Sequence, residues 1–133
     1  MLILQLTNEQ IYQIFNNIQQ YLVTAQQNVI LPLKPNFYLL KNYKTFTMLA
    51  EEIEVMREAI GKKYGTLQED GTYFVEGDNL LIAQQELQEL GNIEQSVEIY
   101  TVSLEDLKDA ELTTKQMEAL LFMIEDEEEK KEN

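Results

Sequence analysis

Apolar residues recur along the first part of this chain with the period of an amphipathic helix. After the apolar start Met1–Leu6, the apolar positions follow i, i+3, i+4, i+7 spacing, at Ile11, Ile14, Phe15, Ile18 and Leu22. Thr7 is followed three residues later by Gln10, which is the pattern of a capping box at a helix N-terminus. The sequence therefore predicts a strand over Met1–Leu6 and a helix that begins at Thr7 and ends near Val23.

A second and much longer helix is predicted over residues 37–64. Its apolar positions alternate at spacings of three and four residues, at Phe46, Leu49, Ile53, Met56 and Ile60. Pro35 is suited to the first turn of this helix, and Gly65 is suited to end it. A helix of this length extends about 42 Å, so we expect other elements to cover its apolar stripe.

Two shorter helices are predicted in the second half of the chain. Asp78 or Asn79 is expected to cap the first, which ends at Gly91. Its inward positions are expected to be Leu80, Ala83, Leu87 and Leu90. Thr113 and Gln116 form a second capping box before the last helix. The apolar face of that helix is expected to contain Met117, Leu120, Leu121 and Ile124.

Strand signals occur at Met1–Leu6, in a hairpin over residues 66–75 around Asp70-Gly71, and at Val97–Leu104. Together these elements predict an α+β fold. Two long helices pack as an antiparallel hairpin with shorter helices, beside a small antiparallel sheet. Residues 1–125 are expected to form a single α+β domain, followed by an acidic, frayed tail at 126–133.

Charge is distributed unevenly along the chain. Residues 1–65 contain six bases and five acids, a net charge of +1, whereas residues 66–133 contain four bases and nineteen acids, a net charge of −15; the two add to the total of −14. Such a separation steers binding partners more than it shapes a fold. The chain has no apolar run of the length that spans a membrane, and we expect a soluble intracellular protein without membrane contact.

The residue inventory argues against catalysis. The chain has no histidine and no cysteine, which excludes the usual general base at neutral pH, Ser-His-Asp arrangements and thiolate chemistry. Glu105, Asp106 and Asp109 are oxygen ligands of the kind that Mg²⁺ accepts, but they lack the spacing of a known cation loop. We therefore predict a protein that is not an enzyme, with no catalytic residue, no cofactor and no metal site.

Two groups of residues are candidates for binding a partner. The first is an acidic surface, and its members are Glu86, Glu89, Glu94, Glu98, Glu105, Asp106, Asp109 and Glu111. The second is a basic and aromatic group at the start of the long helix, and its members are Lys34, Phe37, Tyr38, Lys41 and Lys44. Direct binding to nucleic acid is disfavoured because a chain with a net charge of −14 repels phosphates.

The order of parts resembles a family of small, uncharacterised proteins of tailed phages and prophages of Firmicutes. The similarity covers roughly residues 28–127 and is carried by LPLKPNFYLLKNYKTFTMLAEEIEVMREAIGKKYG, EDGTYFVEG, NLLIAQQELQELGN, VEIYTVSLEDL and LTTKQMEALLFMIEDE. The function of that family is not established, so the resemblance implies a phage context and assigns no residue a role.

These observations lead to two hypotheses about function. In the first, the protein is a phage-encoded inhibitor that binds a host protein in the bacterial cytoplasm through its acidic surface. That host protein would be one that handles nucleic acid or defends the cell. In the second, it is a virion structural or assembly component whose long helix associates with copies of itself or with a tail protein.

Overall fold

The computed structural model describes residues 1–24 and 28–125, so the predicted tail at 126–133 lies outside the described residues. The first half of the chain contains a strand and two helices. These elements are β1 (Leu2–Thr7), α1 (Asn8–Asn17) with a π-helical continuation (Ile18–Leu22), and α2 (Leu33–Tyr64). The long helix α2 begins four residues earlier than the pattern predicts, and Pro35 lies in its first turn as expected.

The second half alternates short strands and helices. It contains β2 (Thr66–Leu67), β3 (Tyr73–Phe74), α3 (Asp78–Asn92), β4 (Glu94–Ile99) and α4 (Thr114–Leu120). Two 3-10 turns, Glu105–Leu107 and Leu121–Met123, complete the described elements. The prediction of an α+β fold with one long helix, shorter helices and antiparallel strands is confirmed.

The strands form two separate sheets rather than the single sheet that the sequence predicts. β1 pairs antiparallel with β4, from Leu2 opposite Ile99 to Thr7 opposite Glu94, while β2 pairs only with β3. The strand predicted at Val97–Leu104 begins at Glu94 and ends at Ile99. It ends there because the backbone of the next residue, Tyr100, bonds to the side chain of Asn42.

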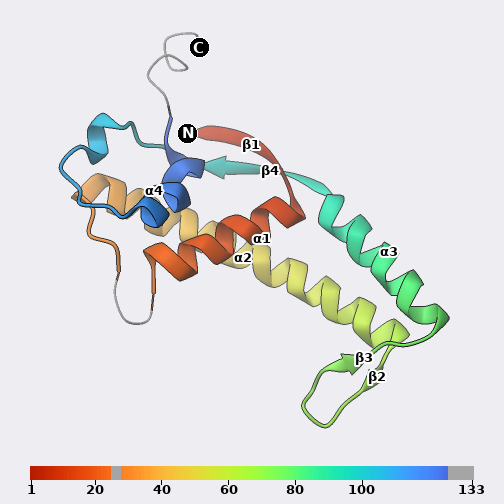
Figure 1. Cartoon of the computed structure of the whole chain (residues 1–133). Helices are drawn as coiled ribbons and strands as arrows, with labels where there is room; N and C mark the ends of the chain where they lie inside the picture. The colour runs from red at the N-terminus through yellow and green to blue at the C-terminus, as the bar shows by residue number, and fades with distance from the viewer. Residues whose placement is uncertain (25–27, 126–133) are drawn as a thin grey trace.

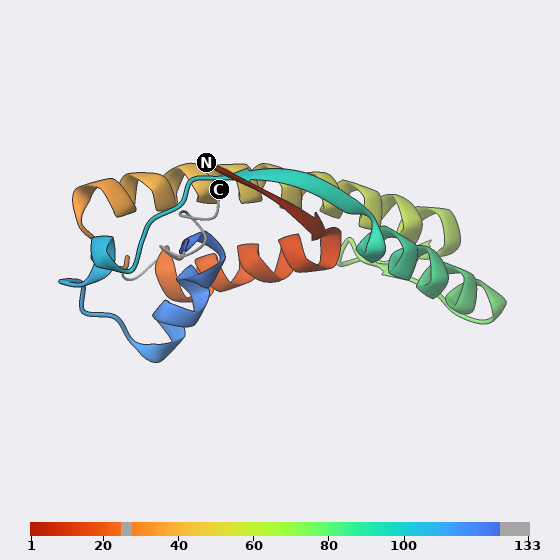
Figure 2. The same cartoon turned by 90° about the horizontal axis from the view of Figure 1, so that it is seen from above.

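The molecule is elongated along α2 (Figures 1 and 2). α1 runs antiparallel to the first half of α2, and α3 runs antiparallel to its second half, as the colours along the chain show. We call residues 53–92 the arm; it consists of the end of α2, the β2–β3 hairpin and α3. β1, β4, α1 and α4 lie with the first half of α2 at the opposite end. The helical hairpin that the sequence predicts is therefore present on both halves of α2.

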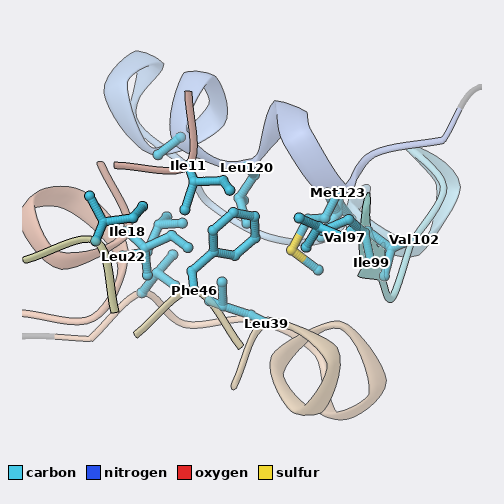
Figure 3. Packing of buried hydrophobic residues seen from close by; sticks show 14 of the residues in the cluster. Ile11, Ile18, Leu22, Leu39, Phe46, Val97, Ile99, Val102, Leu120 and Met123 are labelled. Carbon is cyan, nitrogen blue, oxygen red and sulfur yellow. The ribbon is translucent and has the colours of Figure 1, made fainter. Parts of the chain in front are cut away.

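The hydrophobic core lies between the first half of α2, α1, α4 and β4. Phe46 of α2 is fully buried and points among Ile11, Ile18, Leu22 and Leu120 (Figure 3). Its ring meets that of Phe122 edge to face, with the ring centres 5.4 Å apart. This arrangement confirms the buried face predicted for α1.

The arm is thin and buries few side chains. Its buried apolar residues are Ile53, Ile60, Ala83 and Leu90. Three residues predicted to point inward, Met56, Leu80 and Leu87, are instead 38% to 52% exposed, and Leu87 lines an open concavity between α1, α2 and α3. Leu121, predicted on the buried face of the last helix, is also exposed.

Of the three predicted N-terminal helix caps, two are confirmed. Thr7 and Thr113 each accept a hydrogen bond from the backbone three residues later, at 3.1 Å, and Gln10 and Gln116 bond back to them. The cap predicted at Asp78 or Asn79 is wrong. Gly77 takes that position, with φ at 66°, a region that glycine tolerates better than other residues.

The predicted Asp-Gly turn joins β2 to β3, and Gly71 has φ at 88°. The hydroxyl and backbone N–H of Thr72 both donate to Asp70, which holds the pKa of that carboxyl below its usual range.

Among the described residues, no helix is long and apolar enough to cross a membrane.

Candidate protein-interaction surface

The acidic residues singled out from the sequence fall into two groups toward opposite ends of the molecule. Glu86 and Glu89 belong to α3 in the arm, whereas the 105–111 loop, drawn in light blue, lies at the other end (Figures 1 and 2). Glu94 and Glu98 are exposed along β4, between these groups. The structure therefore spreads the predicted acidic surface along the length of the molecule.

Several of these acids have partners within the chain. Glu86 accepts a 2.8 Å hydrogen bond from the hydroxyl of Tyr64 and lies 3.4 Å from the ammonium of Lys63. The pKa of Lys63 is raised, most by its hydrogen bond with Tyr64 and next by the charge of Glu86. The contacts made by Glu86 join α3 to the end of α2. Its carboxylate therefore helps to hold the arm together.

Some acidic side chains of the 105–111 loop bind to other groups of the chain, and others are exposed. Glu105 forms an ion pair with Lys108 at 2.8 Å. Asp106 accepts a 3.0 Å hydrogen bond from the backbone N–H of Ser103, and the Ser103 hydroxyl accepts one from the N–H of Asp106. Asp109 and Glu111 are exposed at the edge of a hollow of about 700 Å³ next to residues 28–32. All four acids of this loop are exposed, and Glu105 and Asp106 are the two with the contacts described above.

No metal site is assembled from these acids. Within residues 1–24 and 28–125, no group of three or more acidic side chains is arranged to hold a metal ion. Glu105 and Asp106 direct their carboxylates at Lys108 and at the Ser103 backbone.

The basic and aromatic group at the start of α2 is brought together as predicted. The ammonium of Lys34 lies 5.5 Å from the ring centre of Tyr38, and that of Lys41 lies 5.5 Å from the ring centre of Phe37. The Tyr38 ring packs against Tyr100 with the centres 5.2 Å apart, so it is partly buried against the core. Phe37, by contrast, is more than half exposed and points outward.

Phe37 belongs to a larger apolar line that the sequence analysis did not identify. Six large apolar residues of α2 are 47% to 87% exposed. Apart from Met56, they form a line along the helix, namely Leu33, Phe37, Leu40, Met48 and Val55. Their spacings of four, three, eight and seven residues are each close to whole helical turns, so they share one side of the helix. We call this side the outer face of α2; the residues facing the core, such as Phe46 and Ile53, lie on the opposite side.

Charge changes sign along the outer face. Residues 10–50 contain no acid, and the three bases in that stretch are Lys34, Lys41 and Lys44, all exposed. Four glutamates and one arginine follow within residues 51–59. A shallow hollow of about 400 Å³ runs beside Leu40, Lys44 and Met48 at the point where the sign changes. The outer face is thus apolar along its centre, basic at its start and acidic after residue 50.

A concavity of about 490 Å³ lies where α1, α2 and α3 meet. The hydroxyl of Tyr12 donates a 2.7 Å hydrogen bond to Glu54, and the Arg57 guanidinium lies 3.7 Å from Glu54 and 5.5 Å from the Tyr12 ring centre. The bond to Glu54, followed by desolvation, raises the pKa of Tyr12. Tyr12, Glu54 and Arg57 therefore partner one another, and the phenol stays protonated at neutral pH.

The chain shows no significant match to any protein-family model, curated protein or solved structure. The resemblance to phage proteins thus stays a prediction from the sequence.

Proposed function

We propose that this protein is a non-enzymatic interaction module that binds another protein chain through the outer face of α2. The observation that carries this proposal is the line of exposed apolar side chains from Leu33 to Val55. Soluble proteins seldom leave contiguous apolar surface in water unless a partner covers it. A rigid helix also loses little conformational entropy when such a surface is buried.

The chemistry of the outer face describes the partner that fits it. An amphipathic helix docks through apolar residues repeated every three or four positions, and Leu33, Phe37 and Leu40 of the outer face have that spacing. The exposed ammonium groups of Lys34, Lys41 and Lys44 would face acidic side chains beside the partner's apolar stripe. The outer face therefore suits a helix that is apolar on one side and acidic along the edge.

The non-enzymatic part of the proposal is supported by the side chains present. Histidine and cysteine are missing from the sequence, and the pKa of Tyr12 is raised rather than lowered. General base catalysis near neutral pH requires a group whose pKa lies close to that pH. The concavity beside Tyr12 thus supports packing between α1, α2 and α3 better than it supports a reaction.

A second proposal assigns binding to the acidic residues, in a phage protein that inhibits a nucleic-acid-handling or defence protein of the host cytoplasm. It is supported by the net charge of −14 and by the exposure of Glu89, Glu94, Glu98, Asp109 and Glu111. The separation of these residues along the molecule favours the outer face of α2 instead. Binding through the outer face of α2 supports the hypothesis of a virion structural or assembly component over that of an inhibitor.

Site-specific photo-crosslinking in cells that express the protein would test the choice of surface. A photoreactive phenylalanine at Phe37 is expected to form an adduct with a protein chain, and Met48→Glu on the same face is expected to abolish it. The matched control carries the probe at Leu81 of α3, which is equally exposed but lies off the outer face. Adducts from a probe at Glu98 or Asp109, with none from Phe37, would favour the acidic residues and contradict the proposal.

A further inference from the structure

We infer that the outer face of α2 binds a second copy of this chain, with the two α2 helices antiparallel and Phe37 of one copy opposite Val55 of the other. This inference rests on the proposed function of that face and names its partner. The positions of apolar and charged residues along α2, residues 33–64, support this register.

In this register Phe37 of each copy pairs with Val55 of the other, and Leu40 comes opposite Glu52. With Phe37 opposite Val55, the two-fold axis passes near residue 46, and Lys44 lies beside Met48 of the other copy. Leu33 then meets Ala59, whose small side chain is exposed and leaves room for the leucine. Both large apolar residues at the ends of the line, Leu33 and Val55, are thereby covered along with Phe37.

The charges match in the same register, and this decides the direction of the helices. Lys41 comes opposite Glu51, and Lys34 comes opposite Glu58, all four side chains being exposed. Two-fold symmetry repeats each pair, so four ion pairs flank the apolar centre. A parallel pairing would instead place the lysines of the acid-free stretch against one another and the glutamates against one another. The charge pattern of the outer face is therefore self-complementary only when the helices run in opposite directions.

The extent of the contact is compatible with a stable dimer. Residues 33–59 span about 40 Å of helix on each copy. Five large apolar side chains from each copy would enter the interface, together with the aliphatic stems of the lysines beside them. A stable interface buries roughly 1,200 Å² or more in total, which is the extent that this dimer requires. Because the same face is used by both copies, the assembly closes at two and does not continue into a fibre.

Sedimentation equilibrium of the purified chain tests self-association. The unmodified protein is expected to be a dimer at micromolar to millimolar concentration, and Phe37→Glu is expected to raise the dimer dissociation constant at least about tenfold. Leu81→Glu, on α3, is the matched control and is expected to leave it unchanged. Phe37 and Leu81 are both more than half exposed, so circular dichroism should show the same helix content in both variants.

Disulfide crosslinking tests the register, and the absence of natural cysteine makes single-cysteine variants clean reporters. A mixture of Phe37→Cys and Val55→Cys chains is expected to form a mixed disulfide under mild oxidation. Phe37→Cys alone should not crosslink, because its two thiols would lie about 27 Å apart along the helices. Efficient crosslinking by Phe37→Cys alone would overturn the antiparallel arrangement.

The two proposals fail in different ways. If the protein is monomeric at every concentration while a photoreactive residue at Phe37 still crosslinks to a different protein, the second copy is not the partner but the outer face remains the binding surface. If neither a dimer nor an adduct at Phe37 is found, both proposals are overturned.

Discussion

The side-chain amide of Asn42 exchanges two hydrogen bonds with the backbone of Tyr100. Its Nδ2 donates to the Tyr100 carbonyl at 2.8 Å, and the Tyr100 N–H donates to its Oδ1 at 2.9 Å. Tyr100 directly follows β4, and Asn42 is only 1% exposed. Asn42 thus takes over the backbone pairing that β1 provides up to Ile99, and it ties α2 to the sheet.

Asn42→Ala is expected to lower the free energy of unfolding by about 2–4 kcal/mol, because it leaves the partly buried N–H and carbonyl of Tyr100 without the Asn42 side chain as partner. The measurement is guanidinium denaturation followed by circular dichroism. Asn17→Ala, at an exposed position of α1, is the matched control and should change stability by less than about 0.5 kcal/mol. Equal losses in both variants would show that the bonds to Tyr100 carry no special weight.

The two faces of α2 predict opposite outcomes for the same substitution. Phe46→Ala removes a fully buried ring that contacts Phe122 and is expected to cost about 3–5 kcal/mol of stability. Phe37→Ala, on the outer face, is expected to cost less than about 0.5 kcal/mol when measured at a concentration where the chain is monomeric. A large loss for Phe37→Ala in the monomer would mean that its ring belongs to the core.

Substitution by alanine is expected to change the stability of the protein in opposite directions at Gly65 and at Gly91. A Cβ atom at Gly65 would lie 2.8 Å from the Gly61 carbonyl oxygen and 2.9 Å from Cγ2 of Val75, so Gly65→Ala should destabilise the protein by about 1–3 kcal/mol. A Cβ at Gly91, inside α3, would meet only Glu9, at 3.8 Å. Gly91→Ala should therefore stabilise the protein by about 0.5–1 kcal/mol, as helix propensity dictates. Thermal denaturation of both variants measures this difference.

Local signals in the sequence predicted local structure well. The capping boxes at Thr7 and Thr113 depend on residues three positions apart, and both form as expected. The end of β4 depends on Asn42, far away in the chain, and no pattern near Val97–Leu104 could reveal it. A periodic signal also extends only as far as its covering layer. Met56 follows the apolar period of α2 but is 52% exposed, whereas Ile53 and Ile60 of the same stripe are buried.

The outer face of α2 was missed for a related reason. The helix has apolar residues on two sides, and the pattern of a single buried stripe accounts only for the side with Phe46 and Ile53. Leu33, Phe37 and Leu40 form a second line at the same period. Which of the two sides is covered, however, follows only from the packing of α1 and α3.

The phenol of Tyr12 is expected to ionise at a higher pH than a free tyrosine, whose pKa is 10.0, because it donates a hydrogen bond to Glu54. A pKa that is raised in the folded state contributes stability below pH 10, and this contribution is lost as the pH rises through the folded pKa. Ultraviolet titration of the phenolate, comparing the protein with Tyr12→Phe, isolates this group. Glu54→Ala should move the pKa of Tyr12 back toward 10.0, whereas Glu58→Ala, farther along α2, should not.

Two nearby aspartates of the 105–111 loop, Asp106 and Asp109, are expected to differ in their effect on stability. Asp106→Ala removes the acceptor of the Ser103 N–H at the start of a 3-10 turn and is expected to cost about 0.5–2 kcal/mol, as for other lost caps. Asp109→Ala, at an exposed carboxylate, should cost less than about 0.5 kcal/mol in the same denaturation experiment. Asp106 is exposed, but its bond to the Ser103 N–H makes it part of the local structure. A test of binding by acidic residues should therefore reverse Asp109 and Glu111 to lysine and leave Asp106 intact, since a loss of binding would then report on charge and not on an unfolded loop.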